Sequence, residues 1–217
     1  MIIVVGCNKG GAGKTTTATN LAVGLSLNNK DVCLVDADQQ RSAAKWHKDR
    51  EEAEHNPKIT LVEKLDNLTQ TLLTLDSKFD YIIVDVAGRN SREMITGAMV
   101  SDFILAPHQA SQLDLDTLDE LQQQTKRLRD FNPKLRVLIY HAMASTNPSV
   151  KDTERSEFLD YVNQFEEFEP LKAIGYYRKI YKDVISNGQS VLESGNRQAI
   201  EETEILMKEL FNNDKKT

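Results

Sequence analysis

The chain has little cysteine and no long apolar run in its 217 residues. Its two cysteines, Cys7 and Cys33, lie in or beside short apolar segments, where a small buried thiol is a commoner role than a disulfide or a reactive site. No apolar stretch approaches the roughly 20 residues that a membrane-spanning helix needs. No basic, cleavable leader precedes the first apolar run. These absences predict a protein of the reducing cytoplasm that does not span a membrane.

Positive charge is also scarce. Lys and Arg number 27 against 33 Asp and Glu, which gives a net charge of −6, so a surface that is basic throughout is excluded. Any contact with nucleic acid must therefore come from a local patch. The four histidines, His47, His55, His108 and His141, lack the spacing of metal ligands, and we assign no metal to them.

A glycine-rich loop is the most informative feature that is present. Residues 8–17 read Asn-Lys-Gly-Gly-Ala-Gly-Lys-Thr-Thr-Thr and follow an apolar run typical of a buried strand. Gly13, Lys14 and Thr15 fit the phosphate-binding pattern G-x-x-x-x-G-K-[ST], although Asn8 stands where its first glycine is expected. A turn whose glycines only relieve backbone strain would leave Lys14 and Thr15 unexplained. The predicted nucleotide-binding residues are Lys9, Gly10, Gly11, Ala12, Gly13, Lys14, Thr15 and Thr16.

Apolar periodicity predicts strands that alternate with helices. The expected strands are 1–6, 32–36, 58–63 (a short edge strand), 81–85, 102–106 and 136–140. The expected helices are 13–27, 42–54, 65–75, 92–100, 114–130, 152–168, 178–187 and 197–211. This alternation favours an α/β fold with a mostly parallel sheet and helices on both faces, of the P-loop NTPase type. We expect one domain over residues 1–217, with a frayed tail at 212–217.

Three carboxylates end strands on the side where such sheets bind ligands. Asp36 and Asp38 follow the second strand, and Asp85 ends the strand at 81–85. The Thr15 hydroxyl and Asp85 are the first choice as Mg²⁺ ligands, because this cation prefers oxygen ligands and tends to keep several waters. Taken singly, Asp36 or Asp38 could instead be a helix cap or a turn residue.

Several segments resemble the ParA/MinD family of ATPases. Residues 9–16 are similar to its deviant Walker A motif. Residues 32–40 resemble its Asp-x-Asp-Pro-Gln strand, with Gln39 in place of the proline, and residues 81–88 resemble its Walker B strand and switch. Residues 174–193 resemble the C-terminal segment of short plasmid-partition ParA proteins.

The resemblance implies an ATP-binding, Mg²⁺-dependent and weakly active ATP hydrolase that forms a homodimer on ATP. It implies that Lys9 reaches the partner's nucleotide, that Asp36 supports the metal shell and that Asp38 orients the attacking water. The implied catalytic residues are thus Lys9, Lys14 and Asp38, and the metal residues are Thr15, Asp36 and Asp85. It further implies binding of DNA without sequence preference, association with the nucleoid and a separate centromere-binding adaptor protein.

A short segment near the C-terminus could supply the DNA contacts. It places four basic residues within eleven positions, whereas residues 151–169 hold seven acidic and two basic ones. The basic residues are Lys172, Arg178, Lys179 and Lys182. A solvated face without a partner is the other interpretation. The nearby Tyr176, Tyr177 and Tyr181 are more typical of a core or of an adenine-pocket edge than of a nucleic-acid stacking platform.

Other family members fit less well. A MinD-like membrane ATPase would end in a basic amphipathic helix, whereas residues 201–211 are acidic. Cys7 and Cys33 are not placed to bridge an iron–sulfur cluster. A P-loop metabolic ligase such as dethiobiotin synthetase does not require Lys9. The preferred interpretation is a ParA-type DNA partition ATPase, and positioning of another cargo by a ParA-like ATPase stays open.

Overall fold

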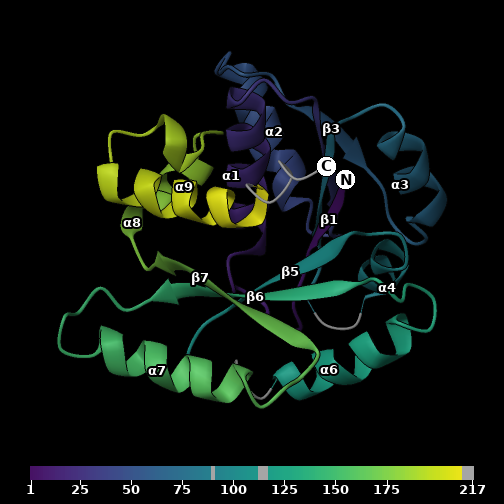
Figure 1. Ribbon diagram of the computed structural model, residues 1–217. Coiled ribbons are helices and arrows are strands. Elements are labelled where there is room, and N and C mark those ends of the chain that lie inside the picture. The colour runs from purple at the N-terminus through teal and green to yellow at the C-terminus, as the bar shows by residue number, and fades with distance from the viewer. Residues whose placement is uncertain (89–90, 112–116, 212–217) are drawn as a thin grey trace.

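The computed structural model describes residues 1–88, 91–111 and 117–211. Seven parallel strands form one sheet in the order β3-β2-β4-β1-β5-β6-β7 (Figure 1). The strands are β1 (Ile2–Val5), β2 (Val32–Ala37), β3 (Thr60–Glu63), β4 (Tyr81–Val86), β5 (Phe103–His108), β6 (Arg136–Ala144) and β7 (Phe168–Tyr176). The α/β class and the parallel sheet are therefore confirmed.

Helices cover both faces of this sheet (Figure 1). The helices are α1 (Lys14–Leu27), α2 (Ser42–Glu52), α3 (Thr69–Asp76), α4 (Arg92–Ala98), α6 (Thr117–Leu128), α7 (Lys151–Val162), α8 (Lys179–Ile185) and α9 (Arg197–Phe211), and a 3₁₀ turn η1 spans Val191–Glu193.

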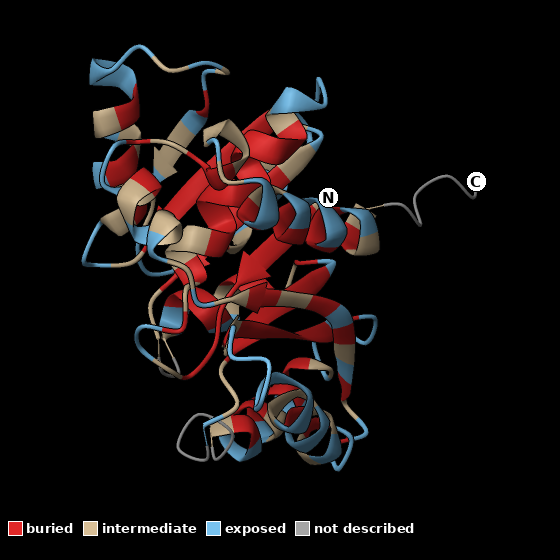
Figure 2. Cartoon of the chain, turned by 90° about the vertical axis from the view of Figure 1, so that its left-hand side faces the viewer, coloured by how far each residue is buried: buried red, intermediate tan, exposed pale blue. Residues whose placement is uncertain are grey.

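The two faces of the sheet have separate cores because successive strand residues point to opposite sides. In β1, Ile2 and Val4 pack with α3, α4, α6 and α7, whereas Ile3 and Val5 pack with α1, α2 and α9. All four side chains are buried, as are most residues of the central strands (Figure 2). This explains why the strands read as continuous apolar runs rather than as an alternating pattern.

The order of the strands brings the predicted site residues together. β1 lies between β4 and β5, so the chain winds outward from β1 in both directions, and the loop after β1 emerges where open parallel sheets bind ligands. β2 pairs with β4 in a register that sets Asp36 opposite Asp85. Residues far apart in sequence therefore meet at the carboxyl edge of the sheet beside the start of α1.

The predicted helix was wrong at residues 163–168, and the strand that follows was not predicted. The helix expected over 152–168 ends at Val162, and the edge strand β7 follows it. Leu171, Ala173 and Gly175 are buried at every second position, which is the period of a strand. Residues 114–116 of the helix expected over 114–130 and the expected tail 212–217 lie outside the described residues.

Candidate functional site

The loop between β1 and α1 turns the chain from the sheet into a helix whose start faces the carboxyl edge. Gly11 and Gly13 have φ angles of 75° and 87°, a left-handed conformation that residues with a Cβ rarely adopt. Gly13 is the N-cap of α1 and supplies no side-chain cap. A helix start of this kind presents backbone N–H groups and a positive dipole end to an anion. We call residues 9–16 the phosphate loop.

Lys14 is buried and lies against its own loop. Its Nζ donates a hydrogen bond of 2.7 Å to the carbonyl oxygen of Lys9, which also accepts a weaker bond of 3.4 Å from the Cys7 thiol. The segment after β4 passes close by, since a Cβ added to Gly88 would lie 3.2 Å from this Nζ. An ammonium group has three donors, so a phosphate oxygen can join or replace the carbonyl as acceptor.

Thr15 and Asp85 connect the phosphate loop to β4. The Thr15 hydroxyl donates to Asp85 Oδ2 at 2.7 Å. The other carboxylate oxygen, Oδ1, is buried and has no hydrogen-bond partner among the described residues. The pKa of Asp85 is raised to about 7, because burial and the nearby charge of Asp36 together outweigh the opposing Thr15 hydrogen bond and the charge of Lys14. A buried carboxylate with an orphaned oxygen is suited to a cation.

Asp36 and Asp38 differ in how their oxygens are used. Asp36 Oδ1 accepts from the backbone N–H of Asp38 at 3.0 Å, and Oδ2 accepts from that of Ala44 at 2.7 Å. Burial raises the pKa of Asp36, although these two bonds oppose the rise. Asp38 is half-buried, and its Oδ1 accepts from the backbone N–H of Gln40 at 2.8 Å. Both aspartates thus accept backbone N–H groups, as a cap or turn residue does. Asp38 also lines a groove together with Glu63 and Arg41.

The donor set fits Mg²⁺ better than a metal held wholly by protein. Within the described ranges, no group of three or more His, Cys, Asp or Glu side chains is placed to hold a metal ion. Mg²⁺ is commonly bound by one or two carboxylates together with waters and substrate phosphates. Thr15 and Asp85 would hold it directly. Because both oxygens of Asp36 already accept N–H groups, this residue fits a supporting position behind water.

A cavity adjoins the phosphate loop on the side of β6 and β7. Its lining combines small loop residues with an aromatic segment that leaves the end of β7. The lining residues are Gly13, Thr16, Thr17, Tyr140, Ala142, Met143, Gly175, Tyr176, Tyr177, Arg178, Tyr181 and Lys182. We call residues 175–182 the aromatic wall. The three tyrosines noted in the sequence thus lie on a pocket edge beside the phosphate loop.

Met143 is a site residue that the sequence reasoning missed. Its φ is 55°, which is unusual for a residue with a side chain, and it lies where the register of β6 and β7 shifts. A Cβ added to Gly13 would lie 3.3 Å from Met143 Cε. The Gln109 amide nitrogen lies 3.4 Å from Met143 Sδ. The irregular end of β6 therefore places the flexible Met143 side chain against the phosphate loop. No local sequence motif predicts this contact.

The four basic candidates for DNA contact do not have equal surroundings. Arg178 is largely covered, since Nε and Nη2 each lie 2.7 Å from Glu202 Oε1. Lys179 pairs with Asp183, and Lys182 donates to the Tyr177 hydroxyl at 3.1 Å. Lys172 is exposed in the middle of β7. Arg178 and Lys182 line the cavity, whereas Lys172 and Lys179 do not.

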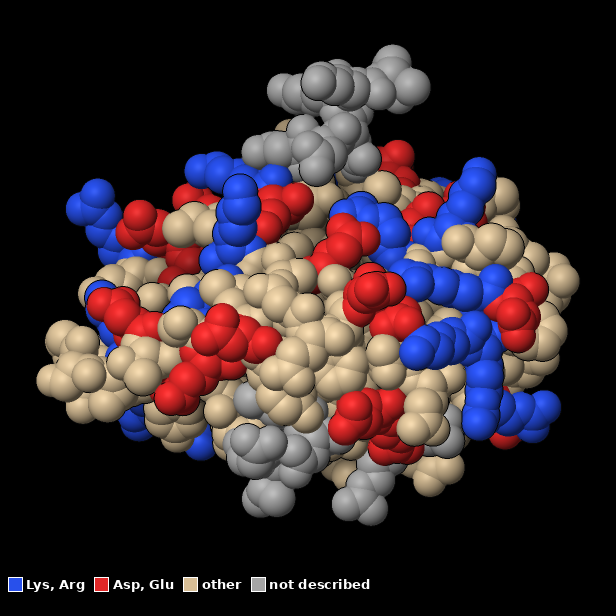
Figure 3. Space-filling model, turned by 60° about the horizontal axis from the view of Figure 1, so that its bottom comes forward, with Lys and Arg blue, Asp and Glu red and all other residues tan. Residues whose placement is uncertain are grey.

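Two further surfaces carry none of the predicted site residues. The face formed by α6 and α7 shows acidic and basic side chains interspersed (Figure 3). A groove of about 600 Å³ lies among residues that include Met99, Asn132 and Glu169, and it is larger than the cavity beside the loop, but no predicted residue lines it. Among the described helices, none is long and apolar enough to cross a membrane.

Comparison with known proteins agrees with this geometry. The family model described as ATPase MipZ matches residues 1–147, a stretch that holds the phosphate loop and all three aspartates. Maintenance of carboxysome distribution protein A from Halothiobacillus neapolitanus is 27% identical over 209 residues, which cover 94% of this chain and 93% of that protein. Protein ParA from Rhizobium radiobacter is 31% identical over 113 residues, which cover 52% of this chain and 50% of that protein.

A solved structure extends the comparison to the whole chain. A plasmid partition protein from Borrelia burgdorferi B31, bound to AMPPNP, aligns over 98% of both chains with a TM-score of 0.74 and 20% identity. At this identity the likeness establishes the fold alone. That fold includes β7, α8 and α9, which follow the segment matched by the family model.

Proposed function

Because the chain belongs to the MipZ family of ParA/MinD-type ATPases, we propose that it is an ATP-dependent switch that partitions DNA. ATP and Mg²⁺ bind at the carboxyl edge of the sheet, and the bound state forms a homodimer. The dimer binds DNA without sequence preference on the nucleoid in the cytoplasm. Hydrolysis, stimulated by a separate centromere-binding adaptor protein, releases it.

The observation that carries the proposal is the Thr15–Asp85 contact beside Lys14. A hydroxyl, a buried lysine and a carboxylate whose second oxygen has no partner in the described part of the chain meet at a helix start without a side-chain cap. Lys14 turns from the Lys9 carbonyl toward the outer phosphates, and the N–H groups of the phosphate loop bind their oxygens. When bound, Mg²⁺ neutralises charge on the phosphates and orients them.

Hydrolysis depends on Asp38, which lies outside the phosphate loop. Asp38 lies at the mouth of a groove with one oxygen held by Gln40, and it orients the attacking water with the other. Such a carboxylate supplies no positive charge for the transition state, so turnover is slow. Lys9 from the partner subunit supplies part of that charge across the dimer interface.

The cavity beside the loop takes the base. Gly13, Thr16 and Thr17, next to the proposed phosphate site, line this cavity together with residues of the aromatic wall. Aromatic rings of this kind stack on a purine. Arg178 and Lys182 line the same cavity and are assigned to the nucleotide. Of the four basic candidates, Lys172 and Lys179 are then the two best placed to bind DNA.

Positioning of a cargo other than DNA is the second candidate function. The observation that favours it is the match to a carboxysome distribution protein, which spans nearly the full length of both chains. This function uses the same ATP switch and the same DNA-bound dimer, and it differs only in the adaptor. A metabolic ligase, by contrast, needs neither a dimer nor DNA.

The test is binding of a fluorescent random duplex DNA, followed by anisotropy with ATP, with ADP or without nucleotide. We expect binding only with ATP and Mg²⁺, and affinity that falls steeply with salt. Lys172→Glu/Lys179→Glu should weaken DNA binding at unchanged ATP affinity. The matched control is Lys48→Glu/Lys58→Glu, which changes two other exposed lysines by the same charge. Equal DNA affinity with ATP, with ADP and without nucleotide would contradict the proposal.

A further inference from the structure

Glu202 is a buried carboxylate that accepts hydrogen bonds from several residues of the aromatic wall. It lies in the middle of α9 and is only 7% exposed. Its Oε1 accepts from Arg178 Nε at 2.7 Å, and its Oε2 accepts from the Tyr176 backbone N–H at 3.2 Å and the Tyr181 hydroxyl at 3.1 Å. All three donor residues line the cavity beside the phosphate loop, whereas Glu202 itself stands behind them.

Each contact fixes a different part of the wall. Arg178 is held at both Nε and Nη2 by Glu202, and its Nη1 donates to Gln198 Oε1 at 2.9 Å. The same guanidinium lies over the Tyr176 ring, 5.6 Å from its centre. Burial, and then the charge of Glu202, raises the pKa of Tyr181, so the hydroxyl keeps its proton and stays a donor. One carboxylate thus sets the positions of a ring, a guanidinium and a hydroxyl.

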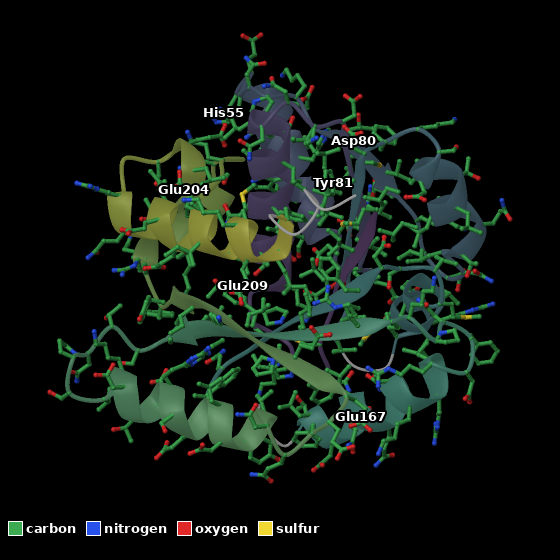
Figure 4. All side chains as sticks on the ribbon, in the orientation of Figure 1. His55, Asp80, Tyr81, Glu167, Glu204 and Glu209 are labelled. Atoms are coloured by element: carbon green, nitrogen blue, oxygen red, sulfur yellow. The ribbon has the colours of Figure 1, made fainter. Side chains whose placement is uncertain are left out.

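The wall needs this support because it leaves the sheet. β7 ends at Tyr176, and α8 begins only at Lys179 without a side-chain cap at Arg178. α9 lies alongside β7, where Glu209 points from the helix toward the strand and accepts the N–H groups of Lys172 and Ala173 (Figure 4). Glu202 continues this support by two further turns of α9, up to the point where the chain turns into α8.

A charge in this position is not explained by packing alone. Burying a carboxylate costs free energy unless it is paired and hydrogen-bonded, and an apolar residue would fill the same space. The donors that satisfy Glu202 all come from the residues that form the cavity. Fixing them in advance removes the ordering cost that a ligand would otherwise meet on binding.

We infer that Glu202 is a positioning residue for the base of the nucleotide: it holds Arg178, Tyr176 and Tyr181 in the arrangement that the base enters. The inference rests on the proposed binding of ATP. Glu202 touches no phosphate, so it acts on ATP affinity through the wall and leaves the phosphate loop unchanged.

The test compares ATP with inorganic triphosphate, which carries the phosphates without the base, by calorimetric titration in Mg²⁺. Glu202→Gln should weaken ATP binding about 10-fold and leave triphosphate affinity within twofold. Glu204→Gln is the matched control, because Glu204 is exposed on the same helix and is expected to change neither affinity. Thermal unfolding of each variant reports any loss of the fold.

Tyr181→Phe keeps the ring and removes one donor, so it provides a milder second variant if Glu202→Gln fails to fold. We expect an ATP-selective loss of about threefold. Equal loss of ATP and triphosphate affinity, or no loss of either, in a folded variant would overturn the role of Glu202. Wild-type protein that binds neither compound would instead refute the proposed function, so the two failures are distinguishable.

Discussion

The phosphate loop and the aromatic wall lie on either side of one cavity but treat their polar groups in opposite ways. On the loop side, one oxygen of Asp85 has no hydrogen-bond partner among the residues that the structure describes, and Lys14 donates to a carbonyl of its own loop. On the wall side, Arg178 and Tyr181 are bound to Glu202. Polar groups left open suit recognition of charge, whereas groups bonded to one another suit recognition of shape. In the proposed function, the loop side therefore binds the phosphates and the wall side binds the base.

The largest effect is expected at the edge of the loop side. Asp38→Ala should lower the hydrolysis rate about 1,000-fold, within the range known for removal of a positioned acid or base, at unchanged ATP affinity. Phosphate release and equilibrium titration measure the two quantities. Asp49→Ala, a matched change in the body of α2, should leave hydrolysis intact. Normal turnover by Asp38→Ala would remove Asp38 from the mechanism.

Replacement of Lys14 tests whether the phosphate loop binds the phosphates. Lys14→Ala removes charge-assisted hydrogen bonds worth about 3 kcal/mol, so affinity for both ATP and triphosphate should fall about 100-fold. This joint loss contrasts with the ATP-selective loss expected at Glu202. Lys30→Ala, an exposed lysine beyond α1, serves as the control in the same titration. Tight triphosphate binding by Lys14→Ala would show that the loop does not hold the phosphates.

A separate effect, on stability rather than on the nucleotide site, is expected beneath the end of β6. His141 is buried and stacks on Phe158 at 4.2 Å between ring centres. Its Nε2 lies 3.2 Å from Glu154 Oε1, but the geometry is not that of a hydrogen bond. Burial, and then the charge of Arg155, lowers the pKa of His141 to about 4. The ring is therefore neutral in the folded protein at pH 7.

Between pH 6.5 and 4 the unfolded chain then binds a proton at His141 that the folded chain does not, so acidification favours unfolding. The loss approaches about 3 kcal/mol, since one pKa unit corresponds to about 1.4 kcal/mol. His141→Gln should flatten this part of the profile. Urea unfolding of both proteins at pH 4.5, 5.5 and 7 measures the difference, and parallel profiles would contradict it.

The two sides also differ in how far the sequence predicted them. The phosphate loop is eight contiguous residues, and Asp36, Asp38 and Asp85 each end an apolar strand, so local pattern placed them together. The sequence predicted a mostly parallel sheet that binds ligands at its carboxyl edge, whereas the order of the strands comes from the structure. This is why most helices and strands were predicted close to their observed bounds.

The aromatic wall depends on contacts that no local pattern contains. Glu202 lies in the run Glu-Glu-Thr-Glu at 201–204, and only the packing of α9 against β7 distinguishes it from the exposed Glu201 and Glu204. The missed strand β7 has the same cause, because its support comes from α9 side chains more than 25 positions away. Met143 adopts its conformation at a register shift between two strands, which is a property of the pair.

The central claim, an ATP-dependent dimer switch, is tested most directly by sedimentation of the wild type and Lys9→Ala with saturating ATP and Mg²⁺. The account predicts a wild-type dimer that reverts to monomer with ADP. Lys9→Ala should bind ATP and remain monomeric, because its charge acts on the other subunit's phosphates. A wild type that stays monomeric with ATP bound, or a Lys9→Ala protein that dimerises normally, would contradict the account.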